Sequence, residues 1–207
     1  MRLLSLVTLL LTFCVGQSAG QGAPSPTKGI TLGSQKNQPG EGMIQGLPGS
    51  QYALFLQNKK HVSLGTIRSA SFFIDRNGSP TRRFRVRLYK VNSPTGEPGP
   101  DMLPQPVVVS AAQGGKWFTV DLQAYKVTAP QEGFFVAMEW IEEGSKPDAG
   151  EAVQDVAQYQ ILRPSFEFTQ PFTWTYAIGK GWSLLPITNG QGRNYNVMIK
   201  AEVDLIN

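Results

Sequence analysis

The chain has 207 residues, of which 41% are hydrophobic and 16% are charged, so it can build a hydrophobic core and is too apolar for an intrinsically disordered protein. Its single cysteine and single histidine exclude an intrachain disulfide and a zinc site of the usual Cys/His type. The 22 glycines and 15 prolines are scattered between short apolar runs, a composition typical of many strands joined by turns.

Residues 1–20 have the features of a secretory signal peptide. Arg2 is followed by the apolar run Leu3–Val15 and then by small residues. The run is shorter than the roughly 20 residues of a membrane-spanning helix. Cys14 lies inside this run, so we expect it to be removed with the leader; the alternative is a lipidated cysteine. We therefore expect an exported protein, periplasmic, on the outer surface or secreted, with no membrane span after the leader.

After the leader, we expect a flexible tether at 21–28 and one β domain at 29–207. Short apolar runs bounded by glycine, proline and polar residues mark the strands, and no stretch shows a convincing helical period. The sequence therefore predicts an all-β fold, a two-sheet antiparallel β-sandwich that is jelly-roll-like. Strands are expected at Gly29–Gly33, Gln51–Gln57, Ser63–Asp75, Arg83–Val91, Gln105–Ala111, Lys116–Leu122, Phe134–Ile141, Ala157–Arg163, Phe166–Phe168, Phe172–Ile178, Trp182–Leu185 and Tyr195–Leu205.

Two of these strands have informative patterns. In Arg83–Val91, apolar and polar residues alternate, which predicts one buried and one wet face. Phe134–Ile141 is apolar on both faces, which is typical of a central strand. We expect Trp117 and Trp140, which lie within patterned strands, to belong to the core.

The segment 84–141 carries a recognisable order of motifs. It contains RVRLYKV at 85–91, GEPGPDML at 96–103, WFTVDL at 117–122 and GFFVAMEWI at 133–141. This order resembles an uncharacterised family of β-sandwich modules in exported bacterial proteins, which often follow a carboxypeptidase-regulatory-like domain. The family is similar in layout to galactose-binding-like jelly rolls. The resemblance implies a fold; it implies no ligand and no catalytic residue.

The formal net charge of +4 is unevenly distributed. Basic residues gather between Lys59 and Lys90, and acidic residues between Glu132 and Asp155. We interpret the two blocks as neighbouring strand regions of complementary charge. The alternative is a basic surface for nucleic acid or an anionic polysaccharide. Because the protein is expected to be exported, we expect no nucleic-acid partner.

Glu139 is the one carboxylate with an unusual position. In Phe134–Ile141 it shares a face with Phe135, Ala137 and Ile141, so this carboxylate is expected either to be paired or to have a raised pKa. We expect a structural cross-strand ion pair with Arg85 or Arg87. The alternative is a glycoside hydrolase-like enzyme that uses Glu139 with a second carboxylate.

Other catalytic and metal sites have little support in the sequence. His61, the only imidazole, stands beside two lysines in a polar turn, so we expect a surface residue and not a general base. Asp75, Asn77 and Asp148 are weak candidates for a calcium ligand, because they lie in turns without a dense acidic spacing. We therefore expect no metal and no cofactor.

The best candidates for ligand binding are aromatic. Trp174 and Tyr176 share a face of one expected strand, and Trp182 follows the next turn. Exposed aromatic rings with polar tips can stack on sugars; the alternative is that these rings fill the core. The sequence favours a non-catalytic binding or structural module of the bacterial cell envelope, whose partner is a glycan or an envelope protein.

Overall fold

A computed structural model describes residues 28–142, 159–185 and 192–206. In these ranges, all regular structure is β-strand except for one 3₁₀ turn, η1 (Gln123–Tyr125). The expected leader, most of the tether and Asp148 lie outside the described residues. The strands are β1 (Gly29–Gly33), β2 (Gln51–Gln57), β3 (Leu64–Ile74), β4 (Phe84–Val91), β5 (Pro98–Asp101), β6 (Val107–Val109), β7 (Lys116–Asp121), β8 (Gly133–Trp140), β9 (Pro164–Ser165), β10 (Thr173–Ala177), β11 (Gly181–Leu184), β12 (Asn196–Val197) and β13 (Ile199–Leu205).

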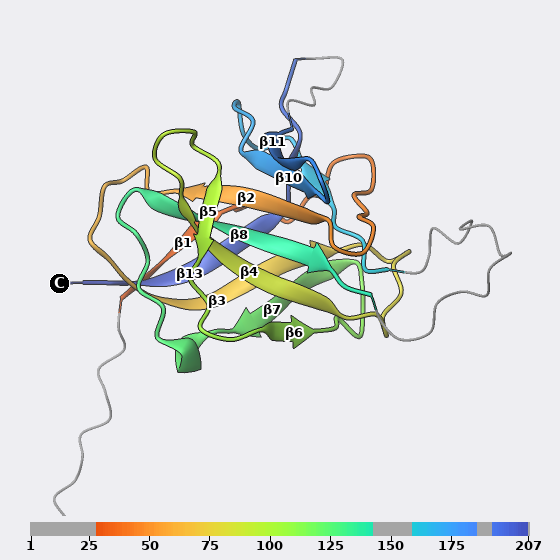
Figure 1. The fold of residues 1–207 in the computed structure, drawn as a ribbon, viewed down its shortest axis with the longest axis horizontal. Coiled ribbons are helices and arrows are strands. Elements are labelled where there is room, and N and C mark those ends of the chain that lie inside the picture. Colours follow the sequence, from red (N-terminus) through yellow and green to blue (C-terminus); the bar gives the residue numbers. More distant parts are fainter. Residues whose placement is uncertain (1–27, 143–158, 186–191, 207) are drawn as a thin grey trace, which may run out of the picture.

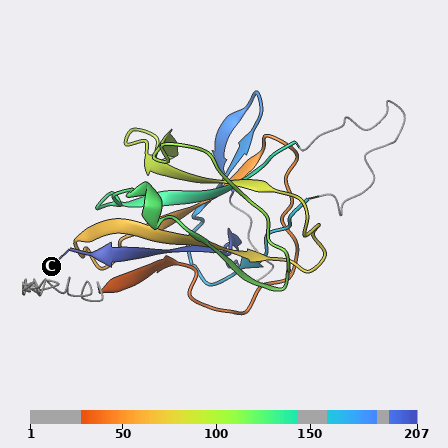
Figure 2. The ribbon, with the colours of Figure 1, turned by 90° about the horizontal axis from the view of Figure 1, so that it is seen from below.

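Two antiparallel sheets face each other (Figures 1 and 2). Sheet A has the strand order β1-β13-β3-β7, and sheet B has the order β11-β10-β2-β8-β4-β5, with β6 also paired to β4. The chain alternates between the sheets from β1 to β4, returns to sheet A at β7, goes back to sheet B at β8 and ends in sheet A at β13, where the first and last strands pair. This is a jelly-roll arrangement, so the predicted two-sheet antiparallel β-sandwich is confirmed.

The core lies between the two sheets. The inward faces of β3 and β4 meet there, where Phe72 and Phe84 pack edge to face with ring centroids 5.3 Å apart. β8 is buried along its whole length between β2 and β4, as its apolar pattern predicts. Its last residue, Trp140, is fully buried. Burial of both faces of β8 means that another part of the chain covers the outer side of sheet B.

The hairpin of β10 and β11 provides this cover. Trp182 of β11 packs edge to face on Tyr89 of β4, with ring centroids 5.5 Å apart. Four strand spacings separate β11 from β4, which would place them about 19 Å apart in a flat sheet. Sheet B therefore curls, and Figure 2 shows the blue hairpin standing out from the layer of β4 and β8. Under it lies a second apolar cluster that includes Ala53, Phe135 and Ala137.

Trp117 is not in the core, contrary to expectation. Alternation along β7 turns Phe118 and Val120 inward and leaves Trp117 half-buried on the outer face of sheet A. There its Nε1 donates a hydrogen bond to Asn37, and the Lys200 ammonium lies 4.2 Å from the ring centroid.

The expected strands at Ala157–Arg163 and Phe166–Phe168 are also wrong for the residues described there. Only β9 forms between residues 159 and 168, and Leu162 makes isolated bridges to Ile44 and Ile74. This segment connects the loop at Ile44 to the end of β3 at Ile74 and adds no strand to either large sheet.

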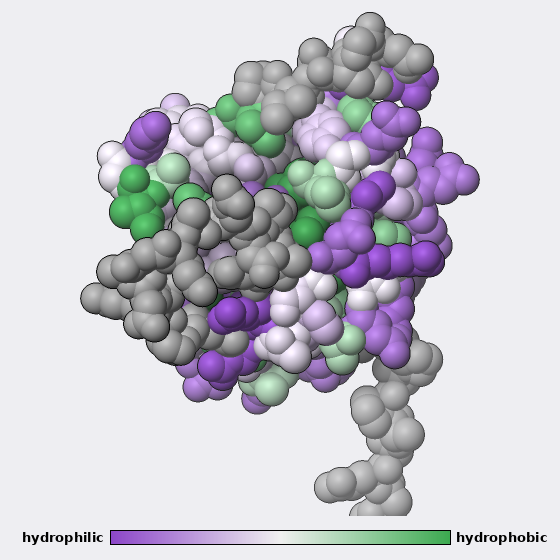
Figure 3. All heavy atoms as spheres, turned by 90° about the vertical axis from the view of Figure 1, so that its right-hand side faces the viewer, coloured by the Kyte–Doolittle hydropathy of each residue, from purple (hydrophilic) through white to green (hydrophobic). Residues whose placement is uncertain are grey.

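The end of the sandwich at the right of Figure 1 is shown in Figure 3. Hydrophobic residues that remain visible there form separate groups among hydrophilic ones. Met43 and Leu47 are exposed by 51% and 68%, respectively. Scattered exposed apolar residues are ordinary in folded proteins, so this end does not by itself indicate a binding surface.

Candidate ligand-binding face

The outer face of sheet B collects the residues with the most distinctive chemistry. Strand register places them in three rows that run across β10, β2, β8 and β4. One row, which contains Ala53 and Ala137, lies between the other two, and its small side chains let the larger side chains of its neighbours reach over it. The rows are Tyr176-Gln51-Glu139-Arg85, Trp174-Ala53-Ala137-Arg87 and, without a β10 member, Phe55-Phe135-Tyr89, which continues to Asp101 of β5.

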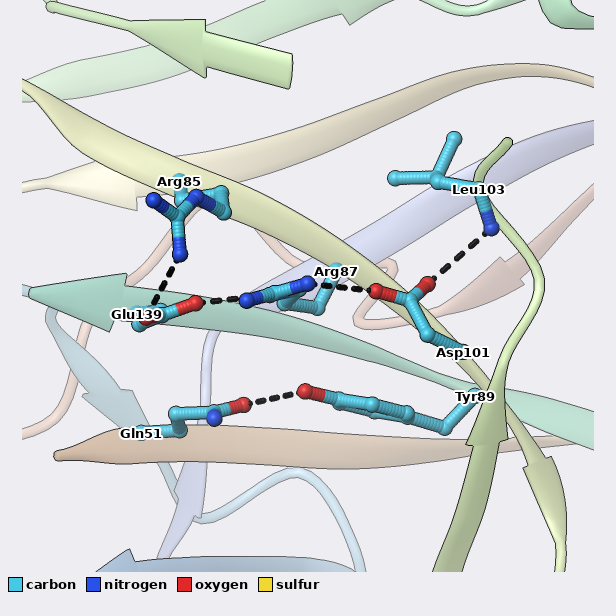
Figure 4. Close-up of polar contacts among 7 residues, drawn as sticks. All are labelled: Gln51, Arg85, Arg87, Tyr89, Asp101, Leu103 and Glu139. Carbon is cyan, nitrogen blue, oxygen red and sulfur yellow. Dashed lines mark hydrogen bonds and ion pairs between the residues drawn. The ribbon is translucent and has the colours of Figure 1, made fainter. Parts of the chain in front are cut away.

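The charged residues of this face form a network of ion pairs in which Arg85, Glu139, Arg87 and Asp101 follow one another (Figure 4). Glu139 accepts hydrogen bonds from Arg85 Nη1 at 2.9 Å and from Arg87 Nε at 2.6 Å. Arg87 Nη1 also donates to Asp101 Oδ2 at 2.8 Å, and the other oxygen of Asp101 accepts the Leu103 backbone N–H at 3.0 Å. The structure thus places Glu139 between the two arginines that the alternating strand pattern indicated.

Electrostatics stabilise the charged form of Arg87. Burial lowers the pKa of Arg87, but its hydrogen bonds with Glu139 and Asp101 outweigh that effect and raise the pKa above the ordinary value. The guanidinium therefore stays charged at any physiological pH. Glu139 keeps no oxygen without a cationic donor, so the network holds the sheet together and presents no open carboxylate.

Tyr89 and Gln51 form a second polar contact that the sequence did not indicate. The Tyr89 hydroxyl donates to Gln51 Oε1 at 2.6 Å, and both side chains are buried (Figure 4). The two residues are on strands separated by β8, so only the folded register brings them together. Burial raises the pKa of Tyr89 well above 10.

This shift predicts a pH-dependent effect of Tyr89→Phe. At neutral pH, loss of the hydrogen bond should lower the free energy of unfolding by about 1 kcal/mol. Above about pH 10, the unfolded phenol loses its proton while the folded one keeps it, so the wild-type protein loses stability as pH rises. Urea unfolding at about pH 9 and about pH 11 should therefore show a shrinking difference between the two proteins. A constant difference would contradict the buried, protonated phenol.

The aromatic part of the face belongs to the β10–β11 hairpin. Trp174, Tyr176 and Trp182 are all half-buried. Trp174 packs on Phe135 with ring centroids 6.4 Å apart, and Tyr176 packs on Trp182 at 5.4 Å. The three candidates from the sequence thus lie together, each with part of its ring against the protein and part toward solvent.

The four tryptophans differ in whether the indole N–H has a hydrogen-bond acceptor. Trp140 Nε1 donates to the Gln160 carbonyl at 2.7 Å, and Trp117 Nε1 donates to Asn37 at 2.7 Å. In the described part of the chain, neither Trp174 nor Trp182 has a hydrogen-bond acceptor for its Nε1. Tyr176 Oη and the facing Gln51 Nε2 also have no partner there. The hairpin therefore carries several polar atoms that are free to contact a ligand.

The remaining candidates lie elsewhere. The Asp75 carboxylate pairs with Arg163 at 2.8 Å and accepts the Asn77 backbone N–H at 2.8 Å, so this turn offers calcium no free carboxylate oxygen. His61 is exposed in the turn after β2. Across residues 28–142, 159–185 and 192–206, no three His, Cys, Asp or Glu residues gather closely enough to hold a metal ion.

No protein-family model and no curated protein matches the chain. Among solved structures, it is similar to the cysteine protease and lectin-like domains of Cwp84, a surface layer associated protein of Clostridium difficile, with a TM-score of 0.49 and 10% sequence identity. The match covers 76% of this chain and 32% of that chain, so this chain spans about a third of its neighbour. At these values the likeness carries no functional argument. The part of the chain that the structure describes contains no helix long and apolar enough to cross a membrane.

Proposed function

We propose that this protein is a non-catalytic binding module of the bacterial cell envelope, exported by its leader, and that it binds carbohydrate on the outer face of sheet B. The observation that carries the proposal is the set of unpartnered indole and phenol groups on the β10–β11 hairpin, within the part of the chain that the structure describes. Tryptophan and tyrosine with one face packed and a free polar tip suit a ligand that is apolar on one side and hydrogen-bonding at its edge. Sugar rings have this character.

Packing of the hairpin supports a binding role. Trp182 packs on Tyr89, and Trp174 packs on Phe135, so these contacts reduce the side-chain entropy that remains to be lost when a ligand binds. The hydrogen bond from the Tyr89 hydroxyl holds the Gln51 side chain on the strand position next to Tyr176, where its amide nitrogen can donate to a hydroxyl group. Aromatic platforms with a few fixed polar groups are typical of small-ligand sites.

The geometry disfavours the glycoside hydrolase alternative. A hydrolase needs one carboxyl group that delivers a proton and a second that acts on the sugar. Glu139 accepts hydrogen bonds from Arg85 and Arg87. The nearby Asp101 carboxylate accepts hydrogen bonds from Arg87 and from the Leu103 backbone N–H. Both carboxylates are therefore committed to structural contacts.

A glycan array tests the proposal. The labelled full chain is expected to be retained by at least one class of glycan. Tyr176→Ala should reduce that signal, since the variant keeps the β10 backbone pairing and loses the half-buried ring that packs on Trp182. Trp117→Ala is the matched control, because this half-buried aromatic lies on the opposite sheet, and its signal should equal that of the wild type. Failure of every glycan to retain the wild-type chain would contradict the carbohydrate proposal and leave an envelope protein as the partner class.

A further inference from the structure

A separate pocket lies at the edge of the sandwich, where β1 of sheet A contacts β2 of sheet B. Its volume is about 460 Å³, within the range of small-molecule sites. The apolar lining comes from β1, β2 and the segment before β10: Ile30, Leu32, Phe55, Phe168 and Phe172. The three rings form a continuous set, with centroids 6.3 Å apart for Phe55 and Phe172 and 5.5 Å apart for Phe168 and Phe172.

Positive charge lies beside this apolar lining. Lys59 Nζ lies 5.6 Å from the centroid of the Phe168 ring and 5.5 Å from that of Phe172, and Lys60 also lines the pocket. Within the described ranges, neither lysine forms an ion pair with a carboxylate. The cations are therefore available to a ligand.

The acidic residue of the pocket is already engaged. Glu167 accepts hydrogen bonds from the backbone N–H groups of Gln35 at 3.0 Å and Lys36 at 3.2 Å. These contacts fix its carboxylate on the 35–36 loop and do not neutralise Lys59. With two lysines against one glutamate, the charged groups of the lining favour an anion.

We propose that this pocket binds a small amphipathic anion, with its apolar body among the phenylalanine rings and its carboxylate or phosphate group at Lys59. An ammonium already held over two rings needs little reorganisation to meet an anion, and charge-assisted hydrogen bonds are about twice as strong as neutral ones. A concave site of this volume suits a free molecule better than a flat membrane surface. The pocket shares Phe55 with the outer face of sheet B, but Trp174, Tyr176 and Trp182 do not line it, so this proposal does not depend on glycan binding there.

Titration calorimetry of the full chain with dodecanoate tests this proposal. We expect one saturable site, which Lys59→Gln weakens by about tenfold or more and Phe168→Ala also weakens. Lys180→Gln, at the exposed tip of the β10–β11 hairpin, is the matched control and should bind as the wild type does. Urea unfolding of each variant checks that the fold is retained.

Four results would overturn the proposal. The first is an absence of saturable dodecanoate binding to the folded wild-type chain. The second is equal affinity for dodecanol, since the uncharged alcohol lacks the group that Lys59 should recognise. The third is unchanged affinity in folded Lys59→Gln. Cosedimentation of the chain with anionic phospholipid vesicles, in place of dodecanoate binding, would assign the lysines to a lipid surface and would equally reject a free ligand.

Discussion

Replacing Glu139 with alanine is expected to lower the free energy of unfolding by about 3 kcal/mol. The change leaves two guanidinium groups without their shared carboxylate on a largely covered sheet face. Breaking a buried pair usually costs about 3–5 kcal/mol, and the lower end applies because the arginine side chains keep 27–28% exposure. Urea unfolding at neutral pH measures the effect.

Glu202→Ala is the matched control for this experiment. Glu202 also lies on the outer face of a strand, β13, but it is exposed, so its removal should change stability by no more than about 0.5 kcal/mol. The hydrolase alternative makes the opposite prediction for Glu139. If Glu139→Ala left stability unchanged and abolished a hydrolase activity of the wild-type chain, Glu139 would be a catalytic residue and the structural assignment would be wrong.

Replacing Trp140 with alanine should be at least as damaging, at about 3–5 kcal/mol. Trp140 is fully buried and packs edge to face on Tyr52 with ring centroids 5.6 Å apart. Its removal opens a cavity and leaves the Gln160 carbonyl, which accepts the indole N–H, without a donor. The free energy of unfolding from urea titration is again the measurement.

Trp117→Ala is the control that distinguishes position from residue type. The variant loses the ring contact with Phe73, the cation–π contact with the Lys200 ammonium and the hydrogen bond to Asn37. Together these losses should lower the free energy of unfolding by about 1 kcal/mol. Equal losses for the two variants would contradict the placement of Trp117 on the outer face of sheet A.

Patterns with a strict period predicted the sheets well. Alternation in Arg83–Val91 identified β4 and its buried face, and the apolar residues on both faces of Phe134–Ile141 identified β8 as central. Within the expected strand Ser63–Asp75, the pairing of β3 with β13 shifts register at Arg68, opposite Glu202 and Val203, a detail that the apolar pattern does not show. Segments without a period were predicted poorly. β5 lies between the expected strands Arg83–Val91 and Gln105–Ala111, where no strand was predicted. Its ladder with β4 depends on the partner strand and not on a pattern of its own side chains.

Residues of the candidate site were predictable only where they departed from the pattern expected for their strand. Glu139 was found because a carboxylate interrupted an apolar face, and Trp174, Tyr176 and Trp182 were found because aromatic residues clustered around one turn. The Tyr89–Gln51 hydrogen bond and the pocket beside Lys59 depend on contacts between strands that are distant in sequence. Nothing in a single strand's pattern signals them, and Gln51 and Lys59 look like ordinary polar residues in the sequence.

The most direct test of carbohydrate binding on sheet B is the affinity of a glycan identified on the array for Trp182→Phe, compared with Trp117→Phe, by titration calorimetry. Phenylalanine keeps most of the packing on Tyr89 but removes the indole N–H that has no acceptor in the described part of the chain. The affinity of Trp182→Phe should fall by about tenfold, whereas Trp117→Phe should bind as the wild type does. Wild-type affinity in Trp182→Phe, with a loss in Trp117→Phe, would move the site to sheet A and contradict a glycan site on the β10–β11 hairpin.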